Sequence, residues 1–203
     1  MNVAVARCVA EAMLPTRHGD FRIALYDAGG VETIALVHGT LTGDAPLVRL
    51  HSECVTGDTL GSLRCDCGEQ LDAALALIGR TGGVLLYLPQ EGRGIGIANK
   101  VRAYALQDRG LDTVEANEAL GLPVDAREYR SAAAVLRALG LRRVRLITNN
   151  PAKQRDLEAE NLVVVERVPL EARPNLINLR YLETKAARMG HLILGREEGE
   201  AAS

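Results

Sequence analysis

The pattern of apolar and polar residues divides the chain into a β-rich beginning and a longer region in which strands and helices alternate. Short segments rich in β-branched residues, separated by turn signals, run up to residue 52. They predict strands over residues 6–14, 21–27, 31–39 and 46–52. The stretch Asp27-Ala28-Gly29-Gly30 predicts a hairpin connection.

Beyond Cys67 apolar residues recur at intervals of three and four, which is typical of helices. We predict helices over residues 68–80, 97–110, 127–140 and 177–190. Shorter apolar runs predict strands over residues 82–88, 143–149 and 162–168. A further helix is expected to begin at Asn150-Pro151, with Asn150 as the N-cap.

Two of these helices have a defined apolar face. In the helix over 97–110, the spacing places Ile97, Val101, Tyr104 and Ala105 on one face. In the helix over 127–140, we expect Ala132, Val135, Leu136 and Leu139 to point inward. The elements together predict an α/β fold with a mixed-sheet core, flanking helices and a β-rich N-terminal portion. We predict one domain over residues 1–195 and a polar, disordered tail over residues 196–203.

Composition excludes some classes of function. Apolar residues make up 47% of the chain, enough for a sizeable core. Aromatic residues make up only 3%, and the net charge is -2. A nucleic-acid-binding surface needs stacking rings or a basic field, so we expect no nucleic-acid partner. An anionic ligand would have to be met by a local cluster of Arg and Lys.

The sequence also indicates a cytoplasmic location without a membrane partner. No apolar run reaches the roughly 18 residues that a membrane span needs. Arg7 and Glu11 interrupt the apolar start of the chain, which is unlike a signal peptide. Cytosolic thiols stay reduced, so clustered cysteines are expected to bind metal or do chemistry rather than form disulfides.

Three of the four cysteines, Cys54, Cys65 and Cys67, lie within fourteen residues. In a regular strand, Cys65 and Cys67 would point to opposite faces, so we place residues 61–67 in a loop. Three thiolates with one open position are typical of a catalytic zinc site. Such a site lowers the pKa of a bound water to about 7. The isolated Cys8 is predicted to be a small core residue.

His51 allows a second interpretation of this cluster. It lies three residues before Cys54 and could be a fourth ligand, which would make the site closed and structural. The alternative function is then a non-catalytic zinc-binding module with a Cys3His site. A third possibility is a cytosolic thiol redox or metal-transfer protein built on Cys65-Asp66-Cys67.

Two turns between a strand and a helix are candidates for binding phosphate. Residues 90–96 contain three glycines and Arg93, so backbone N–H groups can approach an anion closely. In residues 148–153, the Thr148 hydroxyl, Lys153 and a helix N-terminus are expected to converge. Each turn also fits an ordinary connection. Residues 112–117 are expected to form a polar loop, as are residues 125–127.

Taken together, these motifs resemble GTP cyclohydrolase II, which opens the guanine ring of GTP at the start of riboflavin synthesis. The resemblance covers nearly the whole chain in order. It runs through the stretches HSECVTGDTLGSLRCDCG, QEGRGIG, NKVRAYALQD, DTVEAN, TNNPAK and TKAARMGHL. It implies a homodimer with one Zn²⁺ per chain and with Mg²⁺ on the triphosphate. We expect the chain to be too short for the second riboflavin-pathway enzyme to which this domain is sometimes fused.

The resemblance also implies roles for individual residues. Zinc would be held by Cys54, Cys65 and Cys67. Asp125 would accept a proton, Arg127 would act at the α-phosphate, and Tyr104 would assist ring opening. The residues implied to bind GTP are Val48, Arg49, Leu50, His51, Ser52, Glu53, Gln70, Glu91, Gly92, Arg93, Thr113, Thr148 and Lys153.

Arg127 has two possible roles. The family resemblance implies a nucleophile that takes up the GMP moiety. A guanidinium with a pKa above about 12 is a poor nucleophile unless Asp125 removes a proton as it attacks. Physical chemistry alone favours a clamp on the α-phosphate. A further alternative within the family is a cyclohydrolase that opens the ring but leaves the formyl group on the product, or that does not release pyrophosphate. The presence of Tyr104 argues for full release.

Overall fold

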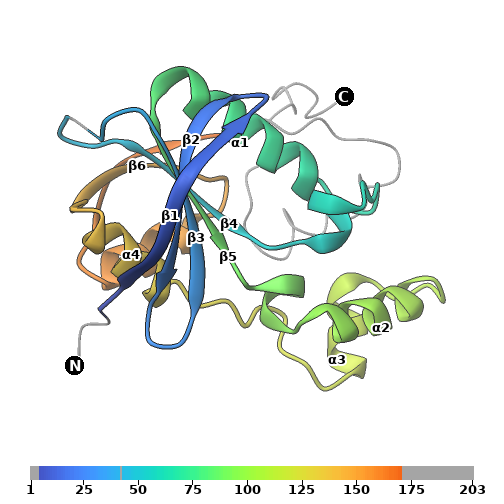
Figure 1. The fold of residues 1–203 in the computed structure, drawn as a ribbon. Helices are drawn as coiled ribbons and strands as arrows, with labels where there is room; N and C mark the ends of the chain where they lie inside the picture. The colour runs from blue at the N-terminus through green and yellow to red at the C-terminus, as the bar shows by residue number, and fades with distance from the viewer. Residues whose placement is uncertain (1–4, 42, 171–203) are drawn as a thin grey trace, which may run out of the picture.

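The computed structural model describes residues 5–41 and 43–170, and its centre is one seven-stranded sheet (Figure 1). Along the sheet the strand order is β1-β2-β3-β5-β4-β6-β7. The strands are β1 (Arg7–Thr16), β2 (Gly19–Asp27), β3 (Glu32–His38), β4 (Leu47–Ser52), β5 (Gly83–Leu88), β6 (Arg143–Ile147) and β7 (Val163–Val168).

The sheet is mixed. Strands β1, β2, β3 and β5 pair antiparallel, whereas β5, β4, β6 and β7 pair parallel. The expected hairpin joins β2 to β3, where Ala28 donates its N–H to the carbonyl of Val31 at 3.0 Å. The predicted fold class is therefore confirmed: a mixed sheet with a β-rich N-terminal portion.

Helices cover both faces of the sheet (Figure 1). Helix α1 (Cys67–Thr81) buries Ala74 and Ile78 against one face. On the other face lie α4 (Arg130–Ala138) and α5 (Pro151–Ala159). The predicted inward positions Ala132, Val135 and Leu136 of α4 are buried, as its apolar spacing predicts. The Asn150 side chain caps α5 by accepting the N–H of Ala152 at 2.9 Å, also as predicted.

The remaining helical elements lie near the ends of β4 and β5. They are a π-helical turn η1 (Val55–Thr59), a 3-10 turn η2 (Glu91–Gly94), and helices α2 (Ile97–Gln107) and α3 (Thr113–Ala119). Helices α2 and α3 project beyond the end of β5, away from the sheet (Figure 1).

Two predictions about single segments were wrong, those for Cys8 and for residues 112–117. The predicted apolar face of α2 is largely exposed, since Ile97 and Val101 are 44% and 54% exposed. The buried side of α2 carries Lys100 and Ala103, because this helix packs beside α3 and η2 rather than on the sheet. Cys8 is exposed, not in the core, because β1 is the edge strand and most of its side chains face outward.

The predicted polar loop over 112–117 forms the start of α3. The Asp112 side chain accepts the N–H of Glu115, and the Glu115 side chain accepts the N–H of Asp112. This capping box satisfies backbone donors at the helix start, which stabilises the helix. The predicted helix over 177–190 and tail over 196–203 lie outside the described residues. Within the described part of the chain, no helix has both the length and the apolar character to cross a bilayer.

Candidate functional site

The predicted site residues gather where three neighbouring parallel strands end. Strands β5, β4 and β6 lie side by side and run in the same direction, so their carboxyl ends meet at one edge of the sheet. Cys54 follows β4, Glu91 follows β5, and Thr148 follows β6. Ligands of α/β proteins bind in the crevice outside such strand ends.

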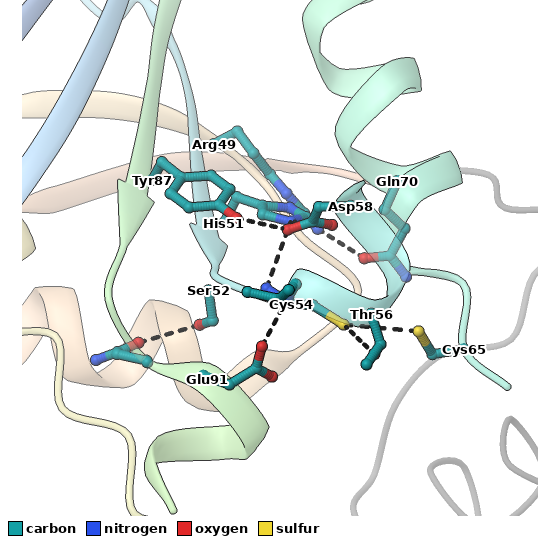
Figure 2. Close-up of polar contacts among 12 residues, drawn as sticks. Arg49, His51, Ser52, Cys54, Thr56, Asp58, Cys65, Gln70, Tyr87 and Glu91 are labelled. Carbon is teal, nitrogen blue, oxygen red and sulfur yellow. Dashed lines mark hydrogen bonds and ion pairs between the residues drawn. The ribbon is translucent and has the colours of Figure 1, made fainter. Parts of the chain in front are cut away.

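The structure brings the three predicted metal ligands together. The sulfur of Cys54 lies 3.7 Å from that of Cys65 (Figure 2), and all three sulfurs lie within 4.8 Å of one another. The predicted loop over 61–67 ends one residue earlier than expected, because Cys67 is the first residue of α1. The helix start turns the backbone, so Cys65 and Cys67 reach the same point.

Two glycines permit this close approach. A Cβ atom on Gly57, in η1, would lie 2.8 Å from the sulfur of Cys65 and 3.2 Å from that of Cys54. A Cβ atom on Gly68, in α1, would lie 2.4 Å from the carbonyl oxygen of Gly57. Real side chains do not reach such distances, so η1 and α1 can pack around the sulfurs only because both positions lack a side chain.

His51 does not join the sulfurs. Its Nε2 lies 3.0 Å from Asp58, and its ring stacks on Tyr87 (Figure 2). Among the described residues, the group that could share an ion consists of the three cysteines without His51. Burial lowers the pKa of His51 and the hydrogen bond to Asp58 opposes this, so the ring is neutral at pH 7. The closed Cys3His interpretation therefore lacks its expected fourth ligand.

Asp58 anchors η1 through several donors. Its carboxylate accepts the N–H of Cys54 at 3.0 Å and the hydroxyl of Tyr87 at 2.9 Å, besides contacting His51. Only 3% of its side chain is exposed. Because the N–H belongs to a cysteine of the cluster, Asp58 fixes where the Cys54 sulfur lies.

Glu91 and Lys100 also contact the segment that carries Cys54. Glu91 accepts the N–H of Val55 at 2.7 Å, and its other oxygen accepts both the N–H of Gly92 and the Lys100 ammonium. Lys100 Nζ lies 2.8 Å from Glu91 and 3.0 Å from the sulfur of Cys54. Both oxygens of Glu91, a predicted GTP-binding residue, are thus bonded to the protein.

The sulfur cluster holds negative charge at Cys54. Hydrogen bonds from Cys65 and Cys67, followed by those from Lys100 and Thr56, lower the pKa of Cys54 against the effect of burial. The hydrogen bond to Cys54 raises the pKa of Cys65. A thiolate is the form of cysteine that binds metal, so Cys54 is prepared as a ligand.

Arg49 on β4 connects the sheet to α1. It donates to the carbonyl of Ile147 at 3.1 Å and to the side chain of Gln70 at 2.7 Å (Figure 2). Gln70 in turn donates to Asp66, which lies between Cys65 and Cys67. Two predicted GTP-binding residues are therefore part of one chain of hydrogen bonds that reaches the cysteine turn.

Several other predicted GTP-binding residues serve the fold. Val48 and Leu50 are fully buried in the sheet. Lys153 is also buried, and its ammonium donates to the carbonyl of Leu50 at 2.7 Å. The hydroxyl of Thr148 accepts the N–H of Asn150 at 3.0 Å, inside its own turn. The Thr148 hydroxyl and the Lys153 ammonium are thus each bonded to the main chain in the structure.

The end of β4 continues toward the 90–94 turn. The Ser52 hydroxyl donates to the side chain of Gln90 at 3.0 Å (Figure 2), and the N–H of Glu53 donates to the carbonyl of Leu88 at 2.8 Å. Burial raises the pKa of Glu53, and the nearby carboxylate of Glu91 raises it further. The segment between β4 and η1 is therefore attached to the end of β5.

The glycine-rich 90–96 turn lies against the polar segment 125–127. The N–H of Ala126 donates to the carbonyl of Arg93 at 3.0 Å, and a Cβ atom on Gly94 would lie 3.0 Å from the Ala126 carbonyl. Gly92 and Arg93 both have left-handed backbone conformations, with φ of 62°. This tight turn brings Arg93 beside the segment that carries Asp125 and Arg127.

Asp125 and Arg127 form a two-point ion pair. The guanidinium donates to both carboxylate oxygens, through Nε at 2.8 Å and through a second nitrogen. Burial raises the pKa of Asp125, but the hydrogen bonds and charge of Arg127 outweigh it and leave the pKa below its usual value. Asp125 is therefore ionised near neutral pH and its partner is charged.

Tyr104 lies close to the cysteine cluster, and Thr113 lies farther along the chain at the start of α3. The Tyr104 hydroxyl is 3.4 Å from that of Thr56, which is 3.6 Å from the sulfur of Cys54. Burial raises the pKa of Tyr104, so its hydroxyl is protonated at neutral pH. Thr113 is the first residue of α3, directly after its N-cap.

Sequence reasoning missed Asp58, Tyr87 and Lys100, which surround the cluster. Asp58 lies inside the cysteine-rich stretch and could have been singled out as a carboxylate four residues from Cys54. Lys100 gave no comparable signal, because a lysine on a helix usually faces water.

Comparisons with known proteins cover both the fold and the candidate site. The family model "GTP cyclohydrolase II" matches residues 7–169. The riboflavin biosynthesis protein RibBA of Salinispora tropica is 60% identical over 190 residues, covering 91% of this chain and 48% of its own length. RibBA of Mycolicibacterium gilvum is 53% identical over 203 residues, covering 96% of this chain and 48% of its own length. The chain thus spans about half the length of these relatives.

One solved structure is similar at a lower sequence identity. It is RibBX of A. baumannii, a two-domain 3,4-dihydroxy-2-butanone 4-phosphate synthase, with a TM-score of 0.47 and 18% identity. The similarity covers 83% of this chain and 41% of that one. The family match extends from the first strand to the end of the last described strand and includes every element of the site. On this ground the chain belongs to the GTP cyclohydrolase II family.

Proposed function

We propose that the chain is a zinc-dependent GTP cyclohydrolase II. It would hydrolyse GTP to formate, pyrophosphate and 2,5-diamino-6-ribosylamino-4(3H)-pyrimidinone 5′-phosphate, the first step of riboflavin biosynthesis. The observation that carries this proposal is the group of three cysteine sulfurs at the strand ends where the family's nucleotide-binding segments converge. Family membership and the names of the RibBA relatives support the pathway.

The sulfur geometry fits zinc. A tetrahedral ion with Zn–S bonds of about 2.3 Å requires sulfurs about 3.8 Å apart. The Cys54–Cys65 separation is 3.7 Å, and no sulfur pair of the cluster exceeds 4.8 Å. We propose that Cys54, Cys65 and Cys67 hold the ion, and that His51 does not. When bound, zinc would supply a Lewis acid that activates water for attack on C8 of guanine.

The nucleotide's phosphates need positive charge nearby. GTP carries roughly four negative charges, so Mg²⁺ and basic side chains must offset them. We propose that Arg93 and Arg127 do so, since the hydrogen bond from Ala126 to Arg93 joins their two segments. The backbone of the glycine-rich 90–96 turn would donate further hydrogen bonds. Val48 and Leu50 would contribute only by shaping the strand that carries Arg49 and His51.

Arg127 is proposed to act as a clamp rather than a nucleophile. Its two-point pair with an ionised Asp125 stabilises the charged guanidinium, which has no lone pair available for attack. A charged guanidinium held in one orientation is suited to binding an α-phosphate. Tyr104, protonated and close to the cluster through Thr56, is proposed to donate a proton as the ring opens.

The test is product analysis. The metal-replete protein is incubated with GTP and Mg²⁺, formate is assayed, and the nucleotide products are identified by chromatography. We expect formate and pyrophosphate in equal amounts from the wild type and from Cys8→Ser, and neither from Cys54→Ser. Absence of both formate and any ring-opened, formylated product from a wild type that holds zinc would reject the cyclohydrolase and favour a zinc-binding module or a thiol protein. Formylated product would identify the incomplete reaction.

Two smaller proposals accompany this one. Incubation with GTP labelled at the α-phosphate should leave no label on denatured protein if Arg127 is a clamp. Retained label that is lost in Arg127→Lys would instead establish a covalent intermediate. A cytoplasmic homodimer and a single catalytic domain over 1–195 remain predictions, and light scattering after size-exclusion chromatography would measure the dimer.

A further inference from the structure

Lys100 is a buried cation that neither the fold nor the proposed reaction explains. It lies on the inward side of α2 with 9% of its surface exposed. A lysine is rarely buried unless it is paired, because the desolvated ammonium is costly. Its two acceptors in the structure are the sulfur of Cys54 at 3.0 Å and Glu91 at 2.8 Å.

Glu91 holds the ammonium in place. The oxygen that faces Lys100 also accepts the N–H of Gly92, and the other oxygen accepts the N–H of Val55. Val55 directly follows Cys54, so the carboxylate is fixed relative to the sulfur. Three donors share the negative charge of Glu91, whereas the ammonium directs an N–H bond at one sulfur.

This geometry has an electrostatic consequence for a metal ion. Three thiolates give a zinc ion more negative charge than its two positive charges neutralise. Electron density donated by sulfur weakens the ion's ability to polarise its remaining ligand. A charge-assisted hydrogen bond to a thiolate draws density back onto the sulfur, and groups beside the ligands tune a metal in this way.

We propose that Lys100 is a positioning and charge-compensating residue for the metal site, which acts through the sulfur of Cys54. It stabilises Cys54 as a thiolate ligand and keeps the bound ion electron-poor. This inference rests on the proposed zinc site, because without a metal the contact would only support the fold. It gives Glu91 the role of orienting Lys100, separate from its predicted contact with GTP.

Two substitutions separate charge from packing. Lys100→Met keeps an unbranched side chain, one atom shorter, and removes both the charge and the donor. Lys100→Gln keeps an N–H donor and removes the charge. Arg102→Met is the matched control, since Arg102 lies on the exposed side of the same helix and, among the described residues, bonds to Asn99 in its own turn.

The first measurement is zinc affinity, by competition with a chromophoric chelator. Loss of a group that orients a ligand typically weakens metal binding 10–100-fold. We expect a loss in that range for Lys100→Met, a smaller loss for Lys100→Gln, and wild-type affinity for Arg102→Met. Equal affinity of wild type and Lys100→Met would overturn the inference.

The second measurement is the sulfur-to-metal charge-transfer band of Co²⁺-substituted protein. Removing a positive charge from beside a thiolate makes the sulfur a better electron donor, so the band should move to lower energy in Lys100→Met. Lys100→Gln should show a smaller shift in the same direction. If Lys100 only supported the local structure, its variants would lose zinc affinity without this graded shift of the band. A band at the wild-type energy in both variants would reject the inference.

The outcomes for the two proposals differ. If wild-type protein binds neither Zn²⁺ nor Co²⁺ at the cysteines, the zinc-dependent function fails. If the wild type binds both ions while the Lys100 variants match it, only the role of Lys100 fails. Should Lys100→Met not fold, as judged by circular dichroism, the band position of Lys100→Gln alone decides.

Discussion

Gly57 stands so close to Cys65 that a Cβ atom added to it would lie 2.8 Å from the cysteine sulfur. The same atom would lie 3.2 Å from the sulfur of Cys54. Because Gly57 does not adopt a left-handed conformation, its requirement for glycine comes from space alone. The close approach of the three cysteines therefore depends on a residue that is not one of the proposed ligands.

Gly57→Ala should weaken zinc binding at least tenfold, because the new methyl group must push two ligands apart. Zinc content after dialysis at a fixed free-metal concentration measures this. Gly79→Ala is the control, since its Cβ would collide with the His18 carbonyl far from the cysteines. The control should lose stability and keep its zinc stoichiometry. Full zinc affinity in Gly57→Ala would contradict the packing of η1 against α1.

Asp58→Asn should destabilise the protein by about 3 kcal/mol. The amide keeps the shape but places a donor against the N–H of Cys54 or the hydroxyl of Tyr87, and a buried unmatched group of this kind costs about 1–3 kcal/mol each. Urea denaturation of both proteins gives the difference. Asp72→Asn removes the contacts of a half-exposed carboxylate with Arg17 and His18 and should cost less than about 1 kcal/mol. Equal losses in the two variants would rule out a special role for Asp58.

Metal removal should lower thermal stability. A ligand that binds only the folded state adds about 2.7 kcal/mol at 100 times its dissociation constant. Calorimetry with free zinc at that level, and again with excess chelator, should show a lower Tm in chelator. Cys8→Ser should behave like the wild type, because Cys8 lies exposed on β1. Cys65→Ser should be insensitive to chelator, and a chelator response in that variant would place the ion elsewhere.

The acid titration of Asp125 should depend on Arg127. Burial raises the pKa of Asp125 and Arg127 lowers it, so Arg127→Met should leave the pKa above about 3.9, the value for an unfolded chain. In the wild type the folded pKa is the lower one. The pair therefore stabilises the fold above about pH 3.9 and loses this contribution as the pH falls further.

Carbon NMR of the Asp125 carboxyl, assigned by comparison with Asp125→Asn, follows both titrations. We expect the pKa of Asp125 to move upward in Arg127→Met, because the hydrogen bonds and charge of Arg127 that lower it are lost. A titration unchanged by the substitution would mean that the ion pair does not persist in solution.

The exposed apolar side of α2 gives a prediction about packing. Val101 is 54% exposed, so Val101→Ser should change the free energy of unfolding by no more than about 0.5 kcal/mol. Truncation of Ile78, which is fully buried on the inner face of α1, to Ala should cost about 2–5 kcal/mol. Chemical denaturation at low protein concentration compares them. A loss above 1 kcal/mol for Val101→Ser would indicate that this side of α2 is covered in solution.

The sequence predicts those parts of the site that rest on local chemistry. Three cysteines within fourteen residues have few uses, so their meeting could be anticipated from spacing and from the turn that Cys65 and Cys67 require. The sheet was predictable for a similar reason, since apolar runs such as 82–88 have no other stable place than a buried strand. Asn150-Pro151 specified its helix start through capping alone.

Other features depend on what a segment packs against, which periodicity does not contain. The apolar face of α2 does not coincide with its buried side, because the buried charge of Lys100 is stabilised by partners 9 and 46 residues away, Glu91 and Cys54. The start of α3 is different, since the Asp112-x-x-Glu115 signature was present and was simply not used. Asp125 and Arg127 are only two residues apart, so their pairing could be anticipated from the sequence. How far the pair is buried depends on the whole fold and could not.

The attachment of Val55 and Gly92 to one carboxylate links two loops that bind different ligands in the proposed enzyme. A displacement of either loop moves the acceptor on which the other depends. Thermodynamic linkage then requires reciprocity: metal loading should tighten nucleotide binding by the same factor by which nucleotide tightens metal binding. In the proposed enzyme, loss of the ion at the cysteines would therefore reach the 90–96 turn through Glu91, and the metal-free protein would bind GTP more weakly.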